Sequence, residues 1–113
     1  MTVGIALRRA LDARDGHRCA WHILCNEDSL VPHHRSNRGM GGDPSKDRLS
    51  NLVWLCSMTN GLLESDPVTA ERGRQLGIKL SIHANPAREP IVHSVHGLCL
   101  LDDIGGAVPI VKN

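Results

Sequence analysis

Apolar residues in the first part of the chain recur with the spacing of an amphipathic helix. Leu7, Ala10 and Leu11 fall on one face of a helix predicted over residues 3–14. Gly16 suits the C-terminal end of that helix, because glycine adopts the left-handed conformation that often follows a last helical turn. The compact stretch HRCAWHILC comes next and is predicted to be a turn rather than a regular element.

The middle of the chain alternates short apolar runs with polar segments. A strand is predicted over residues 30–35, where Pro32 indicates an edge position. Residues 36–50 are rich in glycine and are predicted to form a loop, and residues 52–55 a short buried strand. The pattern then changes to helical spacing over residues 57–65. The predicted order in this region is strand, loop, strand, helix.

The rest of the chain is predicted to hold one more helix and several short strands. Ser57 is the predicted N-cap of the helix just described, which Asp66-Pro67 closes. A second helix is predicted over residues 67–76 and ends at Gly77. Beyond it, short apolar runs are separated by turn signals at Asn85-Pro86 and Gly105-Gly106. These elements indicate an α+β fold in a single domain, residues 1–113.

Composition narrows the class of protein further. The 113 residues carry a net charge of +1 and include two Trp but no Phe or Tyr, so we expect a modest core of Leu, Ile, Val, Ala and Met. No apolar run has the length of a membrane span, and the N-terminal residues lack the pattern of a signal peptide. We therefore expect a soluble, cytoplasmic protein whose cysteines are free or metal-bound rather than disulfide-bonded.

The glycine-rich loop carries a local excess of positive charge. Four basic residues lie close to one another, and only Asp43 and Asp47 oppose them. This excess indicates contacts with phosphate groups, although a solvated surface loop would show the same charges. The four candidate contacts are Arg35, Arg38, Lys46 and Arg48.

The adjacent pair His33-His34 is the first candidate for chemistry. Neighbouring side chains of a strand point to opposite faces, so one imidazole could face a metal ion and the other an attacking water. Histidine titrates near neutral pH and can serve as a general base without further tuning. Asn60 and Glu64 lie four residues apart on one face of the following helix and could supply the other side of a metal site.

Taken together, HH, then SNLVWLC, then Asn60 nine residues after Asn51, resemble the motif of HNH endonucleases. The resemblance covers residues 19–64, and RSNRGMGG is similar to the loop of small phage-encoded HNH proteins. It implies a ββα-metal core of two strands and a helix, over about residues 17–66. The N-terminal helix would precede this core, and a small β extension over about residues 77–111 would follow it.

The resemblance also implies roles for individual residues. His33 would be a metal ligand, His34 the base that deprotonates water, and Asn51 the side chain that braces the loop and orients that histidine. Asn60 stands where the family usually has a second histidine ligand, and its amide oxygen favours Mg²⁺ or Mn²⁺ as the divalent cation, with Ni²⁺ or Zn²⁺ as further candidates. Glu64 could support the metal or be an exposed helix carboxylate.

Many HNH domains hold a structural zinc with two CxxC pairs, and this chain keeps only part of that pattern. Cys19 and Cys56 match single members of the two pairs, and Thr59 stands where the later pair would end. His22 and Cys25 could complete a tetrahedral site with three cysteines and one histidine. The alternative is a set of buried thiols without zinc.

The remaining candidate ligands do not suggest a second metal site. His93 and His96 are three residues apart in a predicted strand, which would place them on opposite faces. His83 is isolated, His17 is expected at the surface, and Cys99 lies in an apolar run expected in the core.

The function expected from the resemblance is a metal-dependent DNA endonuclease or nickase that grips DNA mainly by its phosphate backbone. Two alternatives remain open. One is a non-catalytic DNA-binding or packaging accessory, and the other is a structural zinc module that binds a protein partner. The setting implied is a bacterial or phage-infected cell, with a possible protein partner in a phage packaging or mobile-element system.

Overall fold

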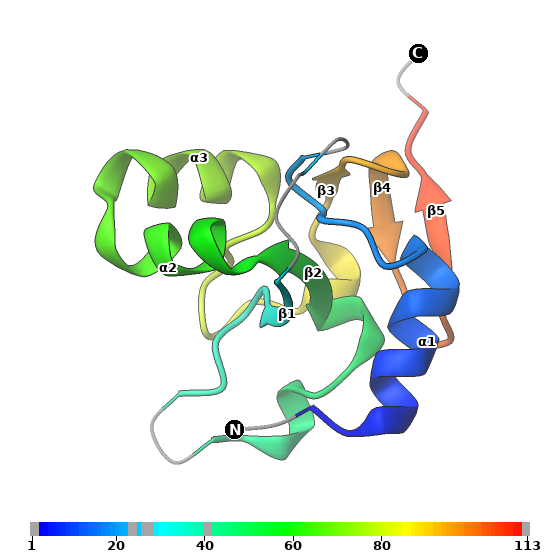
Figure 1. The fold of residues 1–113 in the computed structure, drawn as a ribbon. Coiled ribbons are helices and arrows are strands. Elements are labelled where there is room, and N and C mark those ends of the chain that lie inside the picture. Colours follow the sequence, from blue (N-terminus) through cyan, green and yellow to red (C-terminus); the bar gives the residue numbers. More distant parts are fainter. Residues whose placement is uncertain (1–2, 23–24, 26–28, 40–41, 112–113) are drawn as a thin grey trace.

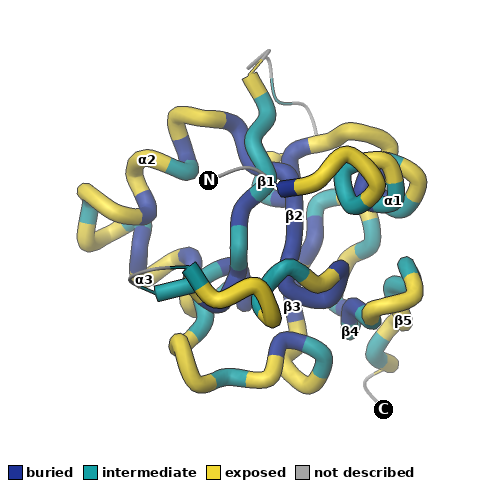
Figure 2. The backbone as a smooth tube through the Cα atoms, turned by 90° about the horizontal axis from the view of Figure 1, so that it is seen from below, coloured by how far each residue is buried: buried dark blue, intermediate teal, exposed yellow. Residues whose placement is uncertain are grey.

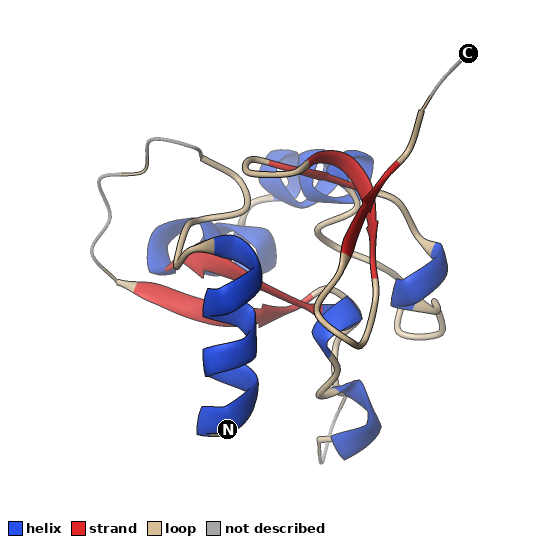
Figure 3. Ribbon diagram, turned by 90° about the vertical axis from the view of Figure 1, so that its right-hand side faces the viewer, coloured by secondary structure: helices blue, strands red, loops and turns tan. Residues whose placement is uncertain are grey.

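The structure is a computed structural model that describes residues 3–22, 25, 29–39 and 42–111. Within these residues, three α-helices, two small antiparallel sheets and three short 3-10 helices give the α+β fold indicated by the sequence (Figures 1 and 3). Predictions for the turn at residues 23–24 and for Gly41 in the loop lie outside the described residues. In chain order the elements are α1 (Ile5–Asp15), β1 (Leu30–His34), η1 (Pro44–Lys46), η2 (Leu49–Asn51), β2 (Leu52–Cys56), α2 (Ser57–Ser65), α3 (Pro67–Leu76), η3 (Pro86–Arg88), β3 (Ile91–His93), β4 (Gly97–Leu101) and β5 (Ala107–Pro109).

The helix boundaries follow the local signals closely. α1 ends at Gly16, whose φ of 69° is the left-handed value that glycine adopts easily. Asp66 caps α3 by accepting a hydrogen bond from the backbone N–H of Thr69, and Pro67 occupies the first turn. The prediction that Ser57 caps α2 is wrong by one residue. Cys56 keeps an extended backbone and is the N-cap, which places a thiol at the start of this helix.

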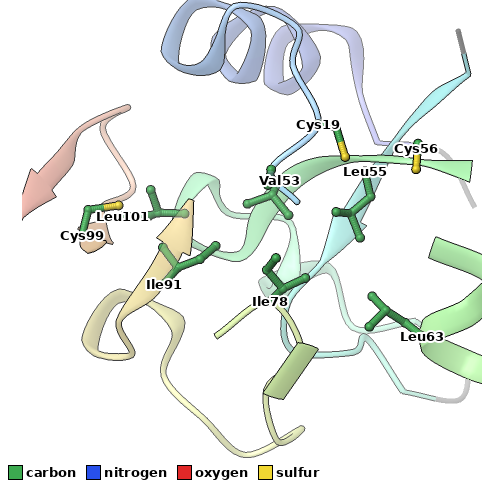
Figure 4. Close-up of a cluster of buried hydrophobic side chains, with 10 residues drawn as sticks. Cys19, Val53, Leu55, Cys56, Leu63, Ile78, Ile91, Cys99 and Leu101 are labelled. Carbon is green, nitrogen blue, oxygen red and sulfur yellow. The ribbon is translucent and has the colours of Figure 1, made fainter. Parts of the chain in front are cut away.

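The strand β2 is the centre of the molecule because it is buried along its whole length (Figure 2). It pairs with β1 in antiparallel register, so that Leu30 faces Cys56 and His34 faces Leu52. Val53 and Leu55 contribute to the larger hydrophobic cluster, drawn in Figure 4, and Leu52 and Trp54 to a second cluster against α1. The larger cluster consists of Cys19, Ala20, Val53, Leu55, Cys56, Leu63, Ile78, Ile91, Cys99 and Leu101.

The composition of the core differs from the expectation in two respects. Cysteines and Trp54 contribute to it, whereas Met58 is 64% exposed, so the core includes thiols and one indole beside the aliphatic residues. Cys99 is fully buried, which confirms its predicted place in the core. No helix within the described residues is both long and apolar enough to cross a membrane.

The second edge of β2 is covered by residues that precede β1. The backbone N–H of Ala20 donates to the carbonyl of Trp54 at 2.8 Å, and the guanidinium of Arg14 donates to the carbonyl of Leu52 at 2.7 Å. Arg14 also donates to the carbonyl of Leu49. These contacts satisfy backbone acceptors that a two-stranded sheet would otherwise leave unpaired. They also fix α1 against the β1–β2 pair, called the hairpin below.

The second sheet has the strand order β3-β4-β5 and forms the C-terminal extension. It packs onto the larger cluster through Ile91, Cys99 and Leu101. Gly77, which follows α3, has a φ of 74° and lies against the backbone of Pro90, the residue just before β3. A Cβ atom added at Gly77 would be 2.0 Å from the carbonyl oxygen of Pro90, so this close approach requires glycine.

Arg35 corrects one of the predicted DNA contacts, because only 1% of its surface is exposed. Its guanidinium donates to backbone carbonyls at the end of α3, in η2 and around η3, and these bonds join the hairpin region to the C-terminal extension. Burial lowers the pKa of Arg35 to about 10, yet it remains charged at neutral pH. A guanidinium surrounded in this way holds the fold together and cannot contact a phosphate. The acceptors are the carbonyls of Ser50, Gly77, Pro86, Glu89 and Pro90.

Candidate functional site

His33 reaches from β1 to the first turns of α2 and is buried, with 9% of its surface exposed. Its Nε2 lies 2.9 Å from the carbonyl oxygen of Ile78, which can only accept, so Nε2 carries the hydrogen and Nδ1 keeps a lone pair. Nδ1 lies 3.1 Å from Oδ1 of Asn60. Burial lowers the pKa of His33, so the ring is neutral, which is the form that binds metals.

The contact between His33 and Asn60 brings two acceptor atoms together. Two such atoms repel unless a cation lies between them or the amide of Asn60 is turned so that its N–H donates. An octahedral cation with bonds of roughly 2.1 Å holds neighbouring ligand atoms about 3.0 Å apart. The 3.1 Å separation therefore fits two adjacent positions around such an ion.

His34 has a different set of contacts from its neighbour. Its Nε2 lies 2.7 Å from Oδ1 of Asp47, in the loop between the two strands. The imidazole and the carboxylate are 18% and 21% exposed, so the pair is partly open to solvent. Arg38 approaches the same carboxylate oxygen at 3.6 Å. The sequence indicated no role for Asp47 beyond its charge, since it lies thirteen positions after His34 and no spacing rule joins them.

Asn51 is fully buried at the end of η2, immediately before β2, and contacts both ends of the loop. Its Oδ1 accepts from the backbone N–H of Ser36 at 2.7 Å, and its Nδ2 donates to the carbonyls of Ser36 and Lys46. The amide is therefore satisfied on both sides. It holds the residues just after His34 close to the residue just before Asp47.

Glu64 lies farther along α2 and is mostly exposed, at 66% of its side chain. Its carboxylate is 3.7 Å from the ammonium group of Lys79. Exposed ion pairs of this length contribute little to stability. Among the described residues, no side-chain hydrogen bond or ion pair joins Glu64 to His33 or Asn60, and its carboxylate pairs with this lysine instead.

A separate cluster gathers the four residues proposed from the cysteine pattern. One ligand atom each from Cys19, His22, Cys25 and Cys56 lies within 4.8 Å of the others, and this group could hold a metal ion. Sγ of Cys19 is 3.7 Å from Nδ1 of His22. In a tetrahedral zinc site with bonds of roughly 2.0–2.3 Å, neighbouring ligand atoms are about 3.6–3.8 Å apart. The separation of Cys19 and His22 therefore matches a tetrahedral zinc site, and the other ligand atoms lie close enough to join the same ion.

This cluster joins two parts of the fold at one end of the large hydrophobic cluster. Cys56 ends β2 and caps α2, whereas its three partners belong to the segment that precedes β1. Figure 4 shows Cys19 and Cys56 at one end of the larger hydrophobic cluster and Cys99 at the other. Cys19 and Cys56 are buried and His22 is exposed, so the cluster lies at the border between core and surface.

The surroundings of Cys56 favour its thiolate form. Burial raises its pKa, but hydrogen bonds with Thr59, Cys25 and Cys19 lower it by more, so that the pKa lies below its usual value. The thiol lies 3.0 Å from Oγ1 of Thr59. The N-terminus of α2 also favours a thiolate. By contrast, burial raises the pKa of Cys99.

The histidines of the C-terminal extension correct a prediction, because His93 and His96 do not point to opposite faces. The chain turns after His93, and both rings meet the buried carboxylate of Asp15 at 3.3 and 2.8 Å. Arg14 donates to both oxygens of the same carboxylate. These three ligand atoms lie close enough for a metal, yet the adjacent guanidinium repels a cation and occupies the oxygens. The group instead joins α1 to the second sheet.

The other predicted basic contacts belong to the loop, where Arg48 is exposed and Arg38 and Lys46 are partly exposed. Arg38 is next to Asp47, and the ammonium group of Lys46 donates to Oγ of Ser36 at 2.8 Å. Arg48 pairs with Asp103. Lys46 and Arg48 also line a cavity of about 200 Å³ together with Asn51, His83, Asn85 and Pro86.

Comparison with protein-family models, curated proteins and solved structures found no match. The geometry itself separates two kinds of donor set. His33 and Asn60 offer one nitrogen and one amide oxygen beside a partly open histidine, which suits a cation that must also bind substrate and water. The three cysteines and His22 offer the closed set typical of a structural site.

Proposed function

We propose that this protein is a metal-dependent DNA endonuclease or nickase of the HNH type, with a ββα-metal core formed by β1, β2 and α2. The observation that carries the proposal is the approach of His33 Nδ1 to Asn60 Oδ1 at 3.1 Å, next to His34 in the same strand. α2 packs against both strands and brings Asn60 to the hairpin. The motif resemblance supplies the reaction, and this arrangement is consistent with it.

The residues would divide the reaction between them. His34 takes a proton from a water molecule, and the resulting hydroxide attacks the phosphorus in line with the leaving 3′ oxygen. His33 and Asn60 would hold a divalent cation, which would supply positive charge to offset the charge that develops on the phosphate and the leaving oxygen. Asn51 keeps the loop in place around His34. The amide ligand favours Mg²⁺ or Mn²⁺ over softer ions.

We assign zinc as the metal of the second cluster, through Cys19, His22, Cys25 and Cys56. Thiolates with one imidazole at tetrahedral spacing are a common structural zinc set. Thr59 occupies the position where a fourth cysteine would stand in the usual family pattern, and Cys25 supplies the missing thiol from the other segment. Zinc bound here would tie the segment before β1 to the junction of β2 and α2.

DNA would be held through its backbone by the loop residues Arg38, Lys46 and Arg48, of which Arg48 is exposed and the other two are partly exposed, and Arg35 takes no part. The cavity that Lys46 and Arg48 share with His83 has no acidic residue in its lining, which favours an anionic group. Trp54 is buried and Trp21 packs partly buried against the larger hydrophobic cluster, so stacking on bases would have little to contribute. Backbone contacts of this kind predict weak sequence preference.

Incubation of supercoiled plasmid with purified protein tests the proposal. We expect nicked or linear product with Mg²⁺ or Mn²⁺, a weaker reaction with Ni²⁺ or Zn²⁺, and none with EDTA. Binding of plasmid without cleavage in any of these metals would contradict the endonuclease and favour the DNA-binding or packaging accessory. Bound zinc without DNA binding would favour the structural zinc module that binds a protein, which the cysteine cluster also fits.

A further inference from the structure

We infer that Asp47 is a positioning residue for His34, fixing which ring nitrogen is free to accept a proton from water. The inference rests on the proposed nuclease function and adds to it a residue that the motif does not contain. Its basis is the 2.7 Å contact between Nε2 of His34 and Oδ1 of Asp47. This is the distance of a charge-assisted hydrogen bond, and it is the shortest described contact of the His34 ring.

A carboxylate can only accept, so Asp47 requires the hydrogen of a neutral His34 to sit on Nε2. The lone pair is then on Nδ1, and among the described residues no hydrogen-bonding partner contacts that atom. The ring is 18% exposed, which leaves room for water to approach. One contact therefore sets both the tautomer and the ring orientation of the base, as a hydrogen-bond acceptor on the second ring nitrogen commonly does for a functional histidine.

Asp47 is itself held in place by the loop. Its backbone N–H donates to the carbonyl of Pro44, closing η1. The preceding carbonyl, that of Lys46, accepts from Nδ2 of Asn51, and the other bonds of Asn51 go to Ser36, two residues beyond His34. Asn51 thus connects the segment that carries the base to the segment that carries its carboxylate. This gives a physical route by which Asn51 orients His34 without touching it.

Arg38 balances the charge of the pair. It lies 3.6 Å from Oδ1 of Asp47 and is only 13% exposed. A guanidinium at this distance partly offsets the negative charge of the carboxylate, whose Oδ1 also meets the His34 ring. It also limits the negative charge near an approaching phosphate, which an isolated aspartate would repel.

The paired variants Asp47→Asn and Asp43→Asn test the role. Each removes one negative charge from the same loop while keeping the side-chain shape, but Asp43 contacts Ser45 and not His34. Asparagine is also a good N-cap, so Asp43→Asn preserves the start of η1. We would measure the plasmid nicking rate constant at saturating Mn²⁺, the DNA affinity, and the ¹⁵N signals of the His34 ring, assigned by their loss in His34→Gln.

We expect Asp47→Asn to lower the nicking rate constant by about 10- to 100-fold, the range for a lost partner of a working imidazole, with DNA affinity little changed. The ring signals should show the Nε2–H form in wild type and a mixture in Asp47→Asn, since an amide can also donate to Nε2. Asp43→Asn should match wild type in all three readouts. An active wild type with an equally active Asp47→Asn, or a wild-type His34 in the Nδ1–H form, would overturn the positioning role alone. A wild type inactive in every metal would overturn the proposed function and this role together.

Discussion

Replacing Cys56 by serine is the sharpest test of the zinc assignment, because this residue belongs both to the cluster and to the junction of β2 and α2. Serine keeps the size of the side chain and its contact with Thr59 but is a poor zinc ligand. We expect purified wild-type protein to contain one zinc ion per chain and Cys56→Ser to contain none.

The size of the effect follows from mass action. Zinc at a free concentration of about a thousand times its dissociation constant stabilises the folded state by about 4 kcal/mol. For a chain of 113 residues each kcal/mol shifts the melting temperature by roughly 4 °C, so stripping zinc from wild type should lower it by about 16 °C. Cys56→Ser should melt near the temperature of the stripped wild type and should not respond to a chelator.

Cys99→Ser is the matched control, since Cys99 is fully buried but does not belong to the group of four candidate zinc ligands. An unpartnered buried hydroxyl costs about 1–3 kcal/mol, so this variant should also melt earlier than wild type. It should nevertheless keep its zinc and its response to a chelator. Thermal melts followed by circular dichroism, with metal content measured on protein purified without added zinc, decide the matter. A zinc-free wild type with a cooperative melt unaffected by chelator would refute the assignment.

Three further predictions concern stability and metal preference. Gly77→Ala should lower the free energy of unfolding by more than about 3 kcal/mol, because a Cβ atom would be strained by the left-handed backbone and would lie 2.0 Å from the carbonyl oxygen of Pro90. Gly16→Ala has the same backbone conformation but open space around it, so it should cost only about 1–2 kcal/mol, and equal losses in urea unfolding would contradict the reasoning. Asp15→Asn should lower the free energy of unfolding by about 3–5 kcal/mol at neutral pH, because it removes one partner of a buried charged group. Burial raises the pKa of Asp15, but hydrogen bonds from a histidine and an arginine lower it by more, so the pKa lies well below its usual value. The contribution of this carboxylate is complete above the unfolded-state pKa of about 4 and is lost as the pH falls towards the lower folded-state value, so the gap between wild type and Asp15→Asn should narrow in acid, and a constant gap would argue against it. Asn60→His should shift the metal preference of cleavage from Mg²⁺ or Mn²⁺ towards Ni²⁺ or Zn²⁺; an unchanged preference would show that this residue does not touch the cation.

Local signals in the sequence were sufficient to predict most of the elements. The bounds of α2 and α3 agree with the prediction. Asp66-Pro67 ends α2 and begins α3, and Gly77 ends α3, through backbone constraints that need no tertiary contact. The grouping of Cys19, His22, Cys25 and Cys56 was one of two alternatives that the cysteine spacing left open, and the structure brings these four residues together.

The features that the sequence did not indicate depend on contacts between distant segments. A basic residue beside a glycine-rich loop is usually solvated, and only the five carbonyls arranged around Arg35 by η2, η3 and the end of α3 explain its burial. His93 and His96 were assigned to one strand, but the turn that begins after His93 brings both to Asp15, 78 residues earlier for His93. Asp47 meets His34 through the folding of an irregular loop, which no periodicity describes.

The measurement that bears most directly on the account compares wild type with His34→Ala in the plasmid assay at saturating Mn²⁺, with DNA binding measured on the same samples. His34 is partly exposed and contributes its contact with Asp47 rather than core packing, so the variant should fold and bind DNA as wild type does. The account predicts that wild type nicks the plasmid, that EDTA stops it, and that His34→Ala loses about 10²- to 10⁴-fold of the rate, the usual contribution of a general base. Cleavage by His34→Ala at the wild-type rate would contradict the assignment of His34 as the base and, with it, the catalytic site proposed for this hairpin and helix.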